Sequence, residues 1–248
     1  MKLKFLVITV LTLIMFNCQT KSKVSENKDT VQAADGKEIE FNFLKHASVY
    51  FIYDGKVFYS DPVIYDGIDY SQLPKADVIF ITHDHYDHLD TNALKQIVAP
   101  NTVFYTNADA KKQLQYDHVI VMENGDMINV QLEDLNFDIT AVPAYNTTPD
   151  RDQFHPKNRD NGYIVTIGGT SIYLPGDCEN IPEMSEFPKI DIAFLPINQP
   201  YTMTVEQAVE AAEIIKPKIL YPFHYGETDL KGLDILKTKG IDVRVFPM

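Results

Sequence analysis

The sequence predicts an α/β protein in which two mixed β-sheets pack face to face, with helices on the outside. Short apolar runs rich in β-branched and aromatic residues alternate with helical or polar segments. The turn dipeptides Asp54-Gly55 and Gly168-Gly169 interrupt two such runs and indicate hairpins, hence antiparallel pairs. The order of strands and helices occurs twice, and each set ends in a histidine-bearing loop. The competing fold, a doubly wound parallel sheet, is disfavoured by the hairpins.

The first set of elements begins near residue 38. Residues 91–98 have helical spacing and stop before Pro100, and residues 108–115 are expected to form a short helix. Strands are expected at residues 38–44, 48–61 (a hairpin), 76–83, 102–106, 118–122, 127–130 and 137–144.

The second set begins with a hairpin at residues 162–177 and a buried strand at residues 191–197. Residues 205–215 have the apolar spacing of an amphipathic helix, which ends before Pro217. A last strand at 218–226 leads into another histidine. At 248 residues the chain is long enough to bury one sizeable core.

The N-terminus has the pattern of an export signal. Two lysines precede an apolar run at residues 5–16 that is too short to span a bilayer comfortably. Met15-Phe16-Asn17-Cys18 resembles a lipobox, with Asn17 where Gly, Ala or Ser is usual. We expect residues 1–18 to be a lipoprotein signal with a lipidated Cys18. The mature protein would then be anchored to the membrane and face the periplasm or cell exterior. A plain secretory signal is the alternative.

The stretch after the signal is polar. Residues 19–38 lack apolar periodicity and are expected to form a flexible tether, so the folded domain is expected at 39–248. Only Cys178 remains after the signal, which excludes a disulfide within the domain. The formal net charge of −13 argues against nucleic acid as a partner and leaves a small-molecule substrate as the expectation.

Residues 81–90, ITHDHYDHLD, hold three of the seven histidines directly after an apolar run. His83 and His85 are two residues apart, so in an extended backbone both point to one side and can share one metal. Asp87 and His88 follow, where the loop can turn back to hold a second ion. Two metals about 3.5–4 Å apart can stabilise a hydrolytic transition state.

Two later strands also end in residues that bind metal. Asp177 follows one strand in Pro175-Gly176-Asp177, and His224 follows another in Tyr221-Pro222-Phe223-His224. Each alone is more often a turn or a structural residue. Beside the histidine cluster they are expected to complete the site, because a carboxylate between two metals can bridge them.

These motifs resemble the metallo-β-lactamase superfamily, in the branch of metal-dependent hydrolases related to ascorbate-6-phosphate lactonase and N-acyl-phosphatidylethanolamine phospholipase D. The resemblance rests on the run His83–His88 with Asp177 and His224, and it extends from about Phe43 to the C-terminus. Leu44-Lys45-His46-Ala47-Ser48, Asp61-Pro62 and Leu73-Pro74-Lys75-Ala76-Asp77 resemble further motifs of that branch. It implies an αββα sandwich, the metallo-β-lactamase fold, with two divalent ions at one edge. Zinc is the expected metal, with manganese or iron as alternatives.

The family pattern requires a third histidine before the second hairpin, and this chain departs from it. Counting forward from residues 137–145 places that position on Asn146, a poor ligand, whereas counting backward from Gly162-Tyr163 places it on His155. The insertion NTTPDRDQF separates the two. We expect His155 to take the position, because neutral imidazole is a common ligand for such metals. Otherwise His155 is a loop residue and the first site is weak or empty.

Further roles follow from loop position. His46 is expected behind the ligands, orienting Asp87 or Asp61, although a purely structural histidine fits equally well. Asp87 is the candidate that orients the attacking water and moves its proton. Candidates for the substrate pocket are Tyr145, Asn146, Lys157, Tyr201 and Thr202.

The expected function is metal-dependent hydrolysis of an ester, lactone, phosphodiester or amide. Two alternatives use the same ligand types. One is redox chemistry at iron, and the other is a metal-binding lipoprotein without catalytic activity.

Overall fold

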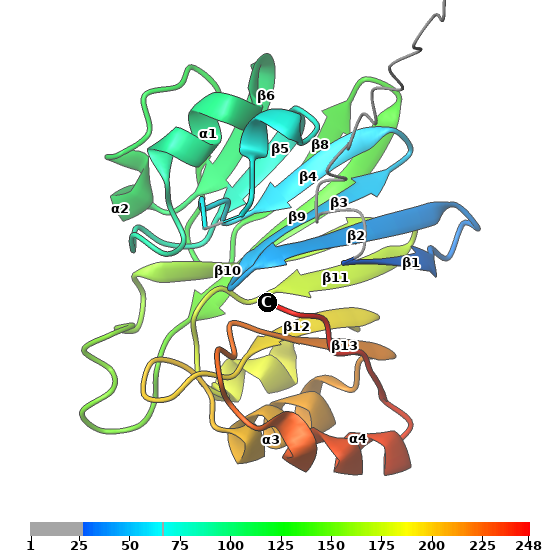
Figure 1. Ribbon diagram of the computed structural model, residues 1–248, viewed down its shortest axis with the longest axis vertical. Helices are drawn as coiled ribbons and strands as arrows, with labels where there is room; N and C mark the ends of the chain where they lie inside the picture. The colour runs from blue at the N-terminus through cyan, green and yellow to red at the C-terminus, as the bar shows by residue number, and fades with distance from the viewer. Residues whose placement is uncertain (1–26, 66) are drawn as a thin grey trace, which may run out of the picture.

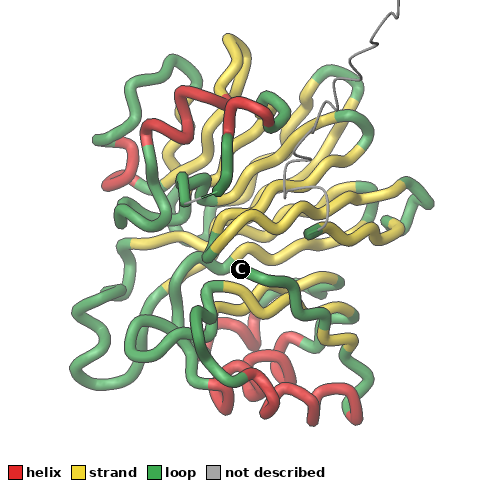
Figure 2. Tube along the Cα trace, viewed as in Figure 1, coloured by secondary structure: helices red, strands yellow, loops and turns green. Residues whose placement is uncertain are grey.

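The computed structural model describes residues 27–65 and 67–248. Two seven-stranded sheets form its centre, and the helices lie in two groups on the outside (Figures 1 and 2). This arrangement confirms the predicted sandwich of two mixed sheets. In the described part of the chain, no helix is both long and apolar enough to cross a membrane.

Each sheet is antiparallel over one half and parallel over the other. The first contains, in spatial order, β1 (Lys28–Gln32), β2 (Glu38–Lys45), β3 (Ser48–Tyr53), β4 (Lys56–Ser60), β5 (Ala76–Ile81), β6 (Val98–Thr106) and β7 (Val119–Val121). Strands β1 to β4 pair antiparallel, and β4 to β7 pair parallel.

The second sheet repeats this design. Its order is β14 (Asp242–Val243), β13 (Ile219–Phe223), β12 (Ile192–Pro196), β11 (Thr170–Leu174), β10 (Asp160–Ile167), β9 (Leu135–Ala144) and β8 (Met127–Leu132). Strands β8 to β11 pair antiparallel, and β11 to β14 pair parallel. The predicted hairpins at Asp54-Gly55 and Gly168-Gly169 are therefore confirmed as the β3–β4 and β10–β11 turns.

The helices cover the outer faces of the two sheets (Figure 1). They are α1 (Thr91–Ile97) and α2 (Ala108–Lys111) on the first sheet, α3 (Val205–Ile215) and α4 (Ile235–Thr238) on the second, and the short 3₁₀ helices η2 (Tyr70–Gln72), η3 (Pro182–Glu186) and η4 (Leu230–Asp234). Helix α3 begins with a capping box between Thr204 and Gln207, and it ends at Lys216 in the left-handed region.

Aromatic side chains fill the space between the sheets. Phe41 and Phe58 of the first sheet contact Phe194 and Phe137 of the second, with ring centroids 5.8 and 5.3 Å apart. All four side chains are buried, and each such burial contributes roughly 1.5–3 kcal/mol. Separate apolar clusters pack α1 and α3 onto the outer faces. The result is four layers, α/β/β/α.

The structure corrects the predicted tether. Residues 28–32 form the edge strand β1, which pairs with β2 from Lys28 opposite Asn42 to Gln32 opposite Glu38. Asp29 there accepts hydrogen bonds from the Tyr221 hydroxyl and from Arg244. Backbone pairing and these polar contacts order the segment without apolar periodicity. The export signal and Cys18 lie outside the described residues.

The expected helix at 108–115 is also shorter than predicted. Helix α2 ends at Lys111, and the amides of Lys112, Gln113 and Leu114 bond to carbonyls three residues back. The chain thus continues in 3₁₀-type turns, and these turns place the Leu114 side chain in the core.

Candidate metal centre

The candidate centre lies at one edge of the sandwich, where strands from both sheets end. The loop after β5 carries His83, His85, Asp87 and His88, and the β2–β3 turn carries His46. Across from them, the loops after β11 and β13 carry Asp177 and His224, and the β9–β10 loop carries His155. Folding therefore gathers residues that are up to about 180 positions apart in the sequence.

These side chains form three overlapping groups, and within each group the candidate ligand atoms lie within 4.8 Å of one another. One group is His83, His85 and His155; the second is His46, Asp87, His88 and His224; the third is His83, His88 and Asp177. Every residue predicted as a metal ligand belongs to one of these groups. The spacing suits two neighbouring cations with shared ligands.

Asp177 lies between the first two of these groups. Its Oδ1 is 3.2 Å from His88 Nε2, and its Oδ2 is 3.3 Å from His224 Nε2. The same Oδ2 is 3.4 Å from His155 Nε2. This buried carboxylate therefore faces histidines of both groups, which is the position of a bridging ligand.

A hydrogen-bonded chain behind the histidines fixes which ring nitrogen carries the proton. Asp61 accepts from the Thr82 hydroxyl at 2.7 Å and is 2.9 Å from His88 Nδ1. Since the Thr82 hydroxyl gives its proton to Asp61, it accepts from His83 Nδ1 at 2.9 Å. Both rings then carry a proton at Nδ1, so Nε2 is the atom that a cation would bind; in its absence, although burial opposes it, the Asp177 carboxylate raises the pKa of His88 and favours a proton there.

His155, rather than Asn146, joins the cluster. Its Nδ1 is 3.2 Å from the buried carboxylate of Asp160, so Nε2 faces Asp177. Its ring centroid lies 5.0 and 4.9 Å from those of His83 and His85. Asn146 is also buried, but its amide donates to the carbonyls of Arg151 and Tyr201. Asn146 thus holds the loop rather than facing the site.

Several buried polar atoms of the cluster lack a hydrogen-bond partner among the described residues. They are Nε2 of His83 and His88, both ring nitrogens of His224, and Oδ1 of Asp177. Some lie within 3.2–3.3 Å of a carboxylate oxygen, but not in hydrogen-bond geometry. A buried polar atom without a partner costs about 1–3 kcal/mol. Imidazole nitrogens gathered around a carboxylate in this way fit divalent cations.

The electrostatics of the cluster also favour cations. Burial lowers the pKa of His83 well below its ordinary value. Burial alone would do the same to His224, but the Asp177 carboxylate raises the pKa of that ring to about 9. Although burial opposes it, the charges of His224 and His88 hold the pKa of Asp177 well below its usual range. Asp177 therefore stays ionised and attracts positive charge, which divalent cations would supply.

Asp87 and His46 form the outer part of the cluster. His46 Nε2 is 3.2 Å from Asp87 Oδ2, and the His46 ring lies against His224 with centroids 3.6 Å apart. Burial would raise the pKa of Asp87, but His224 and His46 hold it well below its usual range. The contact between His46 and Asp87 agrees with the predicted role of His46 behind Asp87. Asp61, the other residue that His46 was expected to orient, bonds to His88 and Thr82 instead.

Backbone conformation marks the same residues. His46, Asp61 and His224 have φ of 61°, 44° and 49°, in the left-handed region that residues other than glycine seldom adopt. Such strain costs about 1–3 kcal/mol and persists at functional sites where surrounding contacts enforce it. The His224 amide, for example, donates to the His46 carbonyl at 2.9 Å.

Gly176 allows the Asp177 loop to approach β5. A Cβ at residue 176 would lie 2.7 Å from the Thr82 Cβ, and φ is +64°. Only glycine fits here without displacing Thr82, which supports His83.

A cavity of about 430 Å³ opens over the cluster. Tyr86, Phe154, Asn198 and Tyr201 line it together with the metal-binding side chains. Phe154 and Tyr201 meet edge to face, with centroids 5.0 Å apart, and Tyr86 is 87% exposed. The cavity therefore has an aromatic wall beside the candidate ligands.

Only one of the five residues predicted for the pocket lies on this wall, namely Tyr201. Tyr145 and Lys157 contact each other and Glu183, whereas Asn146 and Thr202 are buried and bonded to neighbouring backbone. The prediction was wrong for these four because loop position does not reveal side-chain direction. Tyr86 lies inside the ligand motif and Phe154 precedes His155, so adjacency to ligands would have been the better signal.

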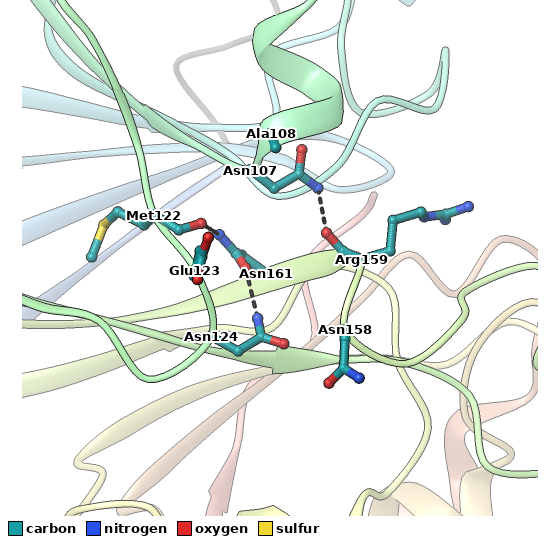
Figure 3. A pocket seen from close by; sticks show the side chains of 8 residues that line it. All are labelled: Asn107, Ala108, Met122, Glu123, Asn124, Asn158, Arg159 and Asn161. Atoms are coloured by element: carbon teal, nitrogen blue, oxygen red, sulfur yellow. Dashed lines mark hydrogen bonds between the residues drawn. The ribbon is translucent and has the colours of Figure 1, made fainter.

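A second cavity of similar volume lies outside the cluster (Figure 3). Asn107, Asn124 and Asn161 surround it, and the guanidinium of Arg159 points away from them. Their amides bond largely to one another and to nearby carbonyls. Because these polar groups already have partners within the protein, we assign no binding role to this cavity.

Comparison with known proteins agrees with this geometry. Residues 40–224 match the family model of the beta-lactamase superfamily domain. A metal-dependent hydrolase of Pyrococcus furiosus is 31% identical over 75% of this chain and 84% of its own length, and one of Archaeoglobus fulgidus is 30% identical over 69% and 78%. A crystal structure from Parabacteroides distasonis is 47% identical and covers 89% of this chain and 98% of its own, with a TM-score of 0.82.

Proposed function

Because the chain belongs to the beta-lactamase superfamily, we propose that it is a metal-dependent hydrolase acting on a small molecule. The bond cleaved would be an ester, lactone, phosphodiester or amide. The observation that carries the proposal is the convergence of unpaired, buried imidazole nitrogens on the Asp177 carboxylate. The names of the relatives support it.

Two sets of residues would hold the cations. His83, His85 and His155 would hold one, and Asp87, His88 and His224 the other, with Asp177 shared between them. Zinc suits this mixture of imidazole and carboxylate best, and manganese or iron would also fit. When bound, the cations would lower the pKa of water toward neutrality and polarise the bond to be cleaved.

The protein's own groups prepare this chemistry. Asp61 and Thr82 hold the rings of His83 and His88 through Nδ1, so that Nε2 is the atom left for a cation. Asp87 lines the cavity, and its carboxylate can accept a hydrogen bond from the attacking water and so orient it; Asp87 is also the candidate that moves the proton of that water. His46 holds Asp87 in place through the contact to Oδ2.

The cavity wall would bind the part of the substrate that does not react. Phe154, Tyr201 and Tyr86 offer aromatic surface, and Asn198 offers an amide. Such a wall favours a substrate with an apolar or planar group next to the cleaved bond.

We further propose that residues 1–18 are an export signal and that Cys18 is lipidated. The lysine-flanked apolar run followed by a cysteine supports this. Mass spectrometry of the mature N-terminus tests it: a diacylglyceryl mass on Cys18 is expected, and an intact Met1 would refute it.

The test of the proposed hydrolase is elemental analysis of the purified protein, followed by turnover of bis-p-nitrophenyl phosphate, p-nitrophenyl acetate and a lactone panel. We expect about two equivalents of divalent metal and turnover that chelator abolishes. Bound metal without any turnover would favour a binding protein, and bound iron with oxygen consumption would favour redox chemistry. Only trace metal after reconstitution would refute the proposal.

A further inference from the structure

The loop between β9 and β10 carries His155 without helix or strand structure of its own. Its side chain nevertheless reaches the cluster with Nε2 3.4 Å from Asp177. A loop of this length loses considerable conformational entropy when one of its side chains is fixed. Contacts elsewhere in the protein must therefore hold it.

Glu179 supplies the strongest of these contacts. Its side chain is fully buried, and Oε2 accepts from the amides of Thr147 and Thr148 at 2.8 and 2.6 Å and from the Thr147 hydroxyl at 3.0 Å. Oε1 accepts from Arg151 at 3.3 Å. A buried carboxylate with four donors, three of them from one turn of the loop, is a specific anchor.

The far end of the loop is held by a second carboxylate. Arg159 forms a two-point ion pair with Asp160, with both N–O distances 2.7 Å, and donates to the Phe154 carbonyl at 2.9 Å. Asp160 accepts from His155 Nδ1. Between the two ends, the backbone N–H of Asn146 donates to the His155 carbonyl at 2.9 Å.

Glu179 also shares a short segment with Asp177. The Asp177 carboxylate faces the histidines, and two residues later the Glu179 carboxylate faces the loop, while the Glu179 amide donates to Tyr145. The segment therefore fixes the shared carboxylate and the position of the loop-borne histidine together.

We propose that Glu179 is a positioning residue that places His155 in the centre and so sets the affinity of the cation site formed by His83, His85 and His155. This rests on the proposed function, since it requires that the cluster binds metal. Partners behind metal ligands typically change affinity about 10- to 100-fold when removed. The effect falls on one site, because the Glu179 carboxylate contacts only the loop. The segment that carries Asp177, which His88 and His224 face, keeps the backbone bond from the Glu179 amide to the Tyr145 carbonyl.

The test is a Co²⁺ titration of the metal-free full-length protein, followed by the visible absorption of the bound ion, with zinc competition for affinity. The variants are Glu179→Gln, which keeps the shape and removes the charge, and Thr147→Val, which removes one donor while two backbone amides and Arg151 still pair with the Glu179 carboxylate. Asp152→Asn is the matched control, because Asp152 is an exposed carboxylate of the same loop. Thermal unfolding of each metal-free protein is measured in parallel.

Glu179→Gln is expected to weaken one of the two binding events about 10- to 100-fold and to leave the other unchanged. Thr147→Val should weaken the same event less, and the control should match the wild type. If Glu179→Gln fails to fold, Thr147→Val decides. Two unchanged events in folded variants, or equal weakening of both, would overturn the proposal. A wild type that binds no Co²⁺ would instead overturn the proposed function.

Discussion

Replacing His155 with alanine tests whether this histidine completes a centre for two cations. The histidine is one of three imidazoles in its group, and its Nε2 faces Asp177. Structural zinc binding is worth about 10–16 kcal/mol over four ligands, or about 3 kcal/mol per ligand. At 1.4 kcal/mol per factor of ten, the variant should bind that cation about a hundredfold more weakly.

The fold itself should tolerate the change. Asp160 keeps its two-point pair with Arg159 after His155 is removed, so no buried charge is left alone. We expect the free energy of unfolding of the metal-free protein to fall by only about 1 kcal/mol, the value of a lost hydrogen bond.

The assay combines metal content after dialysis with initial rates on the substrate found in the panel. The variant should retain about one equivalent of metal and lose most activity. His118→Ala is the control, since His118 is exposed and outside the cluster. Unchanged metal content and rate in His155→Ala would refute the assignment and leave a single site built on Asp87, His88, Asp177 and His224.

Three further changes test other parts of the structure. Thr82→Val removes the hydroxyl between Asp61 and His83 and should weaken metal binding about 10- to 100-fold in a competition titration, whereas Thr82→Ser should not. Tyr201→Ala removes part of the cavity wall and should raise KM with little change in kcat; a lower kcat at constant KM would contradict a binding role. Burial would raise the pKa of Asp29, but Arg244 and Tyr221 lower it below the ordinary 3.8, so its stabilising contribution is present above about pH 4 and is lost as pH falls further. Urea unfolding of Asp29→Asn should therefore show a stability deficit near pH 7 that shrinks below pH 4, and a deficit that is constant with pH would contradict this.

The sandwich was predictable because burial imposes local patterns. Strands such as β12, with every residue buried, appear as short apolar runs, and the hairpins are marked by their turn residues. The run from His83 to His88 was recognisable for the same reason, since its ligands are contiguous. Edge strand β1 was missed because three of its five residues are exposed and its sequence is polar.

The rest of the site depends on contacts between distant segments. Asp61 supports His88, and Glu179 supports the loop of His155, through hydrogen bonds that link residues 27 and 32 positions apart. No spacing rule predicts such contacts. His155 illustrates the limit: two counts along the chain placed the third ligand nine residues apart, and only the folded loop distinguishes them.

The edge strand β1 also limits how far the domain could lie from a membrane to which Cys18 is attached. Because Lys28 is already paired with Asn42, a lipid on Cys18 would connect to the sheet through only ten residues. A fully extended chain of that length spans at most about 36 Å. A domain held so closely would sample a thin layer above the bilayer, and its encounters would be dominated by molecules that diffuse along or leave the membrane surface.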